Sequence, residues 1–248
     1  MSLFFGAAIP GFNTVISVAS FDNYSARLED GALYSCEAKD NSWHVSFVGE
    51  LKEDFINLDC SKFDFSKQFF FIDKIGQYSV SESTRTNALI RTHSFTKTFP
   101  DYRANLSVRS AEGAVSSYQS EYPFEMLKVR SSIVSNCGLL TSRVGENYLV
   151  LVSIIDEPVI HDIQCAIIDR KSGVSLTTFT AHTNRVTVYK LDDCCISGNC
   201  YLCAKGYPMI PIYLNSADDG LSFEHTHPPH DTFVGDFRKV LGDFKNGF

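Results

Sequence analysis

The chain has 248 residues, of which 44% are hydrophobic and 21% are charged. This balance is typical of a globular protein and excludes a disordered chain. The net charge of -7, without any compensating Lys/Arg run, argues against nucleic-acid binding and favours a small molecule, a glycan or another protein as the partner.

Neither an export signal nor a membrane span is evident. The longest apolar run, 148–155, has the length of one strand, whereas a spanning helix needs ~20 residues. The first twenty residues contain no Lys or Arg, and Pro10 and Gly11 interrupt their apolar stretch, so we interpret them as the first strand. We therefore predict a cytoplasmic protein with no membrane partner, whose eight cysteines are reduced.

Short runs rich in Val, Ile, Phe and Tyr recur along the chain, and such residues favour strands. These runs are Asn13–Ser20, Ala32–Ala38, Ser42–Phe47, Gln68–Asp73, Tyr102–Arg109, Asn147–Ile155, Ile163–Asp169, Val174–Thr180, Arg185–Leu191 and Met209–Leu214. We predict a mainly β fold with one domain over 1–248. The expected architecture is an antiparallel β-sandwich, with an open barrel as the alternative.

Three segments give more detail. Residues 148–155 are apolar on both faces, which predicts a central strand covered on two sides. Asp169–Gly173 carries polar turn residues and predicts a hairpin loop. In 185–191, Val186 and Val188 share one face of the expected strand.

Near the C-terminus the hydrophobic period changes to that of a helix. After Pro228-Pro229, Asp231 can cap a helix over about 232–245, with Phe233 and Phe237 on its apolar stripe. Two glycines weaken its intrinsic propensity, so we expect this helix to dock on the sheet.

Three of the seven histidines lie within six residues before this helix. If 221–227 is extended, His225 and His227 lie on one face and can point into one pocket. With Glu224, they suit acid–base catalysis, and the two histidines also suit Zn²⁺ or another divalent metal. His230 and Asp231 are candidate ligand-binding residues. The alternative is a proline-rich turn whose histidines cap the helix.

A second polar cluster lies over 116–123. Carboxylate, amide, hydroxyl and aromatic groups together suit a sugar site, because rings stack on apolar C–H faces while polar groups bind hydroxyls. The candidates are Glu121 as a catalytic carboxylate and Arg103, Ser117, Tyr118, Gln119 and Tyr122 as ligand-binding residues. The alternative is an edge strand that ends at Pro123.

A third cluster contains Cys200 and Cys203, which have the spacing of a zinc knuckle. Structural zinc needs four ligands, usually two separated pairs, and the vicinal Cys194-Cys195 is a poor second pair. Zinc here and reduced, partly buried thiols are the two alternatives.

Two segments resemble those of a poorly characterised bacterial family. They are Ser-Tyr-Gln-Ser-Glu-Tyr-Pro-Phe-Glu-Met at 117–126 and Ser-Phe-Glu-His-Thr-His-Pro-Pro-His at 222–230. That family is associated with surface-polysaccharide gene clusters, and the resemblance covers roughly the last 150 residues. It implies a glycan-related role and assigns no activity or catalytic residue.

These features lead to two functional hypotheses. In the first, the protein binds or modifies a sugar or sugar-containing metabolite in a pocket that both polar clusters line. In the second, it is a non-enzymatic structural or self-assembling protein, a homo-oligomer whose contacts involve Phe233 and Phe237. The first requires two stretches about a hundred residues apart to fold together.

Overall fold

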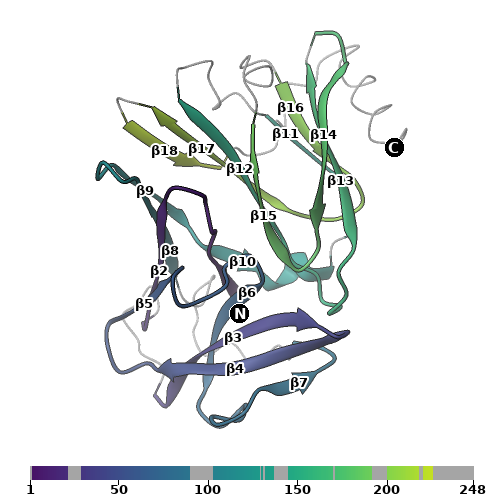
Figure 1. Ribbon diagram of the computed structural model, residues 1–248. Coiled ribbons are helices and arrows are strands. Elements are labelled where there is room, and N and C mark those ends of the chain that lie inside the picture. The colour runs from purple at the N-terminus through teal and green to yellow at the C-terminus, as the bar shows by residue number, and fades with distance from the viewer. Residues whose placement is uncertain are drawn as a thin grey trace.

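The computed structural model describes residues 2–21, 29–89, 103–128, 130, 132–136, 145–169, 171–191, 200–217 and 220–225. Within these ranges the chain forms β-strands and one short 3-10 helix, η1 (Phe124–Lys128) (Figure 1). Every strand pairing in the four sheets is antiparallel, and no sheet of the described chain closes on itself. The prediction of a mainly β, antiparallel protein is confirmed.

The N-terminal half forms two sheets around a common apolar core. The larger has the order β10 (Glu121–Pro123), β1 (Ser2–Phe5), β6 (Gln68–Lys74), β3 (Gly31–Lys39), β4 (Ser42–Glu50) and β7 (Thr84–Thr86). The smaller has the order β5 (Phe55–Asp59), β2 (Asn13–Ala19), β8 (Ala104–Arg109) and β9 (Val115–Gln119). Phe70 of β6 and Leu106 of β8 lie in the same buried cluster.

The C-terminal half forms two more sheets, which lie on the other side of η1 in Figure 1. One has the order β15 (Arg185–Lys190), β12 (Glu146–Ser153), β17 (Ile210–Ala217) and β18 (Gly220–Glu224). The other has the order β11 (Ile133–Asn136), β16 (Cys200–Ala204), β13 (Asp162–Asp169) and β14 (Ser175–His182).

Strand β12 lies between two cores, as its apolar sequence predicts. Val150 and Val152 point into the cluster of the N-terminal half, whereas Leu149 and Leu151 point into the cluster between the two C-terminal sheets. Successive side chains alternate across a strand, so an apolar run can fill both cores at once. The two halves therefore share one apolar cluster through the sheet that contains β12.

Each predicted run coincides with a strand, apart from end residues. The N-terminal segment corrects the prediction, because it forms two strands, β1 and β2, that belong to different sheets. Between them Gly11 has a φ of 83°, a conformation that favours glycine. The short strands β1, β5, β7, β11 and β16 were not predicted, since each has too few residues for a clear pattern.

Turn chemistry explains the hairpins. The Asp169–Gly173 loop joins β13 to β14, and the Asp169 carboxylate accepts hydrogen bonds from the Lys171 and Ser172 amides at 3.1 and 2.8 Å. Between β14 and β15, Asn184 adopts a positive φ of 56° and is fully buried. Its side chain bonds to the backbone of Ile155, Glu157 and Val159, which fixes the segment after β12.

The predicted helix over about 232–245 lies outside the described residues. None of the described helical segments has the length and hydropathy that crossing a bilayer requires.

Candidate functional site

The two predicted polar clusters meet where the edge strands of two sheets come together. Strand β9 ends one sheet and β18 ends another, and the two strands are neighbours (Figure 1). The Phe223 amide of β18 donates a hydrogen bond of 3.2 Å to the Ser116 hydroxyl of β9. Since Phe223 is buried in the common core, this bond satisfies an amide that has little access to water. We call β9, β18 and the adjoining His225 the β9–β18 seam.

An aromatic contact across the seam joins Tyr118 to His225. Their ring centroids lie 5.9 Å apart with an interplanar angle of 61°, an edge-to-face arrangement. His225 Nδ1 lies 2.6 Å from the Pro211 carbonyl oxygen, which can only accept a hydrogen bond. Nδ1 therefore carries the hydrogen and donates it to the Pro211 carbonyl oxygen.

Strand alternation separates the remaining candidates on β9. Tyr118 is half-buried and packs against the common core, whereas Ser117 and Gln119 are exposed. Adjacent residues of a strand point to opposite faces, so Ser117 and Gln119 lie on the face away from His225. One ligand at the Tyr118–His225 contact would not be bound by these two side chains.

After β9 the chain crosses from one sheet to the other at Ser120. The Ser120 amide donates to Ala104 O of β8, and its backbone oxygen accepts a bond from the Phe5 amide of β1. The fully buried Ser120 hydroxyl also accepts a 3.0 Å bond from the Phe5 amide. Tyr122, two residues further on, is 0% exposed and belongs to the common core. Tyr122 is thus part of the core in this structure, and its predicted role in ligand binding stays a prediction.

Glu121 lies next to the seam in a partly dehydrated position. The pKa of its carboxyl is raised above the ordinary value, mainly because the group is buried. A 2.9 Å hydrogen bond from the Ala104 amide and the charge of Arg103 act in the opposite direction and reduce this rise. Burial also raises the pKa of the Tyr118 phenol, and the negative charge of Glu121 adds to this effect. Tyr118 thus contacts the His225 imidazole and lies within electrostatic reach of the Glu121 carboxyl.

Strand geometry bears on the two alternatives for the cysteine cluster. Cys200 and Cys203 both lie in β16, where residues three positions apart point to opposite faces. Cys200 packs into the cluster between the C-terminal sheets and Cys203 does not, although both are buried. They cannot form the knuckle that one zinc ion requires. No group of three or more His, Cys, Asp or Glu side chains in the described ranges could hold a metal ion.

Three predicted residues, His227, His230 and Asp231, lie outside the described residues. Glu224 closes β18 and is exposed. A role for His225 as a metal ligand together with His227 stays a prediction.

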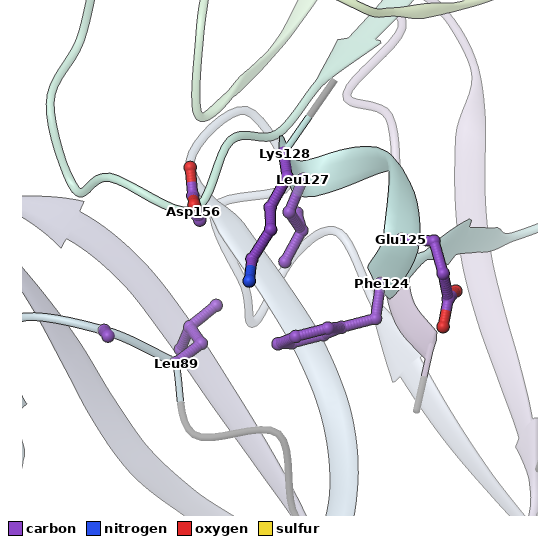
Figure 2. Close-up of a pocket in the computed structure, with 7 residues that line it drawn as sticks. Leu89, Phe124, Glu125, Leu127, Lys128 and Asp156 are labelled. Atoms are coloured by element: carbon purple, nitrogen blue, oxygen red, sulfur yellow. The ribbon is translucent and has the colours of Figure 1, made fainter. Parts of the chain in front are cut away.

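A pocket that the sequence did not indicate lies beside η1, far along the chain from β18. Among the described residues it is lined by Ala88, Leu89, Phe124, Glu125, Leu127, Lys128 and Asp156, and its volume is about 520 Å³ (Figure 2). The residues of η1 follow Pro123 directly and carry no recognisable motif. Only the packing of separate chain segments creates this pocket, so no local pattern could have revealed it.

Comparisons with protein-family models, with curated proteins and with solved structures find no match.

Proposed function

We propose that this protein binds a sugar or a sugar-containing metabolite at the β9–β18 seam. The observation that carries the proposal is the contact between Tyr118 and His225, which joins two polar clusters from distant parts of the chain. The seam also has a hydrogen bond between Ser116 and Phe223, which holds both strands in place before a ligand arrives.

Each group would have a distinct role. The Tyr118 ring offers an apolar surface for the C–H groups of a pyranose, and its hydroxyl offers a hydrogen bond. Arg103 and Glu121 supply a donor and an acceptor for ligand hydroxyls. His225, with Nδ1 held by Pro211, would act through Nε2 as an acid–base group or as a ligand of Zn²⁺ or another divalent metal. The net charge of -7 favours neutral glycans over anionic ones.

Binding to a panel of neutral oligosaccharides and nucleotide sugars, measured by calorimetry, tests the proposal. We expect Tyr118→Ala and His225→Ala each to weaken binding about tenfold, because each removes a direct contact. Gln119→Ala is the matched control, since Gln119 lies on the opposite face of β9. If only Gln119→Ala weakens binding, the ligand lies on the opposite face of β9 and the proposal is contradicted. If the native protein binds none of these ligands, the proposal is also contradicted.

Metal analysis of the purified protein separates the two roles of His225. A bound divalent metal that His225→Ala abolishes supports metal ligation. Metal-free protein that still binds the glycan supports an acid–base or purely binding role.

A second candidate, a self-assembling protein, is favoured by a different observation. Phe55 of the edge strand β5 is 54% exposed and packs edge-to-face on Phe21, with centroids 5.6 Å apart. An exposed aromatic side chain on an open sheet edge is a feature that a second copy can cover. Light scattering of the native protein and of Phe55→Ser distinguishes the candidates. An oligomer that dissociates in the variant supports assembly, and a monomer in both contradicts it.

A further inference from the structure

The pocket beside η1 has the size and the walls of a small-molecule site. Its volume of about 520 Å³ lies within the range of ligand pockets. Phe124, Leu127 and Leu89 provide apolar surface, and the first two come from η1 (Figure 2). All three are buried, with at most 9% of each residue exposed. The apolar part of the pocket is therefore made by side chains that packing already holds in place.

Hydrogen bonds fix the segment that closes the pocket on its other side. The Trp43 indole N–H donates to the Asp156 carbonyl oxygen at 3.2 Å, and the Asp156 amide donates to Leu127 O at 3.1 Å. These bonds connect the N-terminal half, η1 and the segment after β12. The pocket is formed in advance, so a ligand would lose little binding energy to ordering its walls.

The charged side chains are unevenly distributed around the pocket. Arg130 Nη2 lies 2.8 Å from the Asp156 carboxylate, so the negative charge of Asp156 is compensated. Figure 2 shows the Lys128 amine directed towards the gap between Leu89 and Phe124, with the Glu125 carboxylate on the far side of Phe124. Lys128 forms no ion pair within the described part of the chain. One positive charge thus faces an apolar cavity.

We propose that this pocket binds a small monocarboxylate with an apolar body. The apolar body would fill the space between Leu89 and Phe124, and the carboxylate would accept hydrogen bonds from the Lys128 ammonium. A cation would meet the like charge of Lys128. A polyanion would carry more negative charge than the single Lys128 ammonium compensates, and the Glu125 carboxylate would repel the excess. This site is separate from the β9–β18 seam, and the proposal does not depend on the sugar proposal.

Three ligands of the same shape test this charge preference: phenylpropionate, its neutral amide and phenylpropylamine. Amide NMR titrations of the full chain would follow the signals of Leu127 and Asp156. We expect phenylpropionate to bind about tenfold more tightly than the amide, since hydrogen bonds to a charged group are the stronger ones. The amine should bind most weakly. Equal binding of all three, or no shift at these two amides, would overturn the proposal.

Two variants and a control locate the binding. Lys128→Gln should reduce the affinity for phenylpropionate to that for the amide, because it removes the charge and keeps a polar side chain with N–H donors. Ala88→Phe should abolish binding of both ligands by filling the pocket from an exposed position, at little cost to folding. Lys171→Gln, in the exposed hairpin after β13, is the matched control and should change neither affinity. Unchanged binding in Lys128→Gln would contradict the proposal even if Ala88→Phe does not fold.

Discussion

Strands β12 and β9 are both rich in strand-forming residues, yet they are covered to very different extents. From Asn147 to Ser153 every residue of β12 is buried, whereas β9 alternates between exposed and half-buried residues. Burial on both faces makes β12 a source of stability, because each side chain contributes to one of two cores. Strand β9 can contact a ligand because some of its side chains stay accessible to solvent instead of packing in a core. Stability and recognition are thus expected in different strands.

Leu151→Ala should give the largest effect and is the direct test of this contrast. Leu151 is 1% exposed in the C-terminal core, and removal of a buried leucine side chain costs about 2–5 kcal/mol. Denaturant unfolding measures the change in the free energy of unfolding. Ser117→Ala in β9 is the control, with an expected change within about 0.5 kcal/mol. Similar losses in both variants would show that β9 is as important for folding as β12.

Alkaline pH should lower the free energy of unfolding through Cys165, which lies in the core between the two C-terminal sheets. Burial raises the pKa of the Cys165 thiol from 9.0 to about 12. The unfolded chain then loses this proton first as the pH rises, so the stabilising contribution is complete below pH 9 and declines between pH 9 and pH 12. At pH 11 the loss from this group is about 3 kcal/mol.

Urea unfolding of the native protein and of Cys165→Ala at both pH 8 and pH 11 measures this loss. The free energy of unfolding should depend less on pH in the variant than in the native protein. Some dependence should remain because burial also raises the pKa of Tyr78, to about 12. An identical pH dependence in both proteins would mean that the thiol is not protected from solvent.

Of the three predicted losses of stability, the one caused by Ser116→Ala should be the smallest, and this variant tests the contrast at the seam. It leaves the buried Phe223 amide without its hydrogen-bond partner, which costs about 1 kcal/mol. Hydrogen exchange at the Phe223 amide should accelerate more than exchange in β12. If the Phe223 amide stays equally protected, then β18 is held in place by its pairing with β17 alone.

The sequence was most informative where apolar residues recur with the regular spacing of a strand. The apolar run over 148–155 predicted a strand covered on both sides, and the alternation in 185–191 predicted that Val186 and Val188 share a face, which meets the common core. Both follow from local side-chain periodicity. Asn184 was beyond such prediction, because its conformation depends on three backbone partners from the segment after β12.

The candidate site was only partly predictable for the same reason. Alternation correctly separates Ser117 and Gln119 from Tyr118, but it does not reveal that Tyr118 would meet His225 of another sheet. It also does not show that Tyr122 lies beyond a change of sheet and is buried in the core. The spacing of Cys200 and Cys203 alone could not decide between zinc and reduced thiols, because it has a different meaning in a strand and in a turn.

Ser120 links the seam to the first strand of the protein, which provides a natural reporter. The Phe5 amide donates to both the hydroxyl and the backbone oxygen of Ser120, two residues after Tyr118. Displacement of Tyr118 by an incoming molecule would pull on this backbone and change the chemical shift of the Phe5 amide. Occupancy at one edge of the fold could thus be followed from a signal in the N-terminal strand, without any label on the ligand.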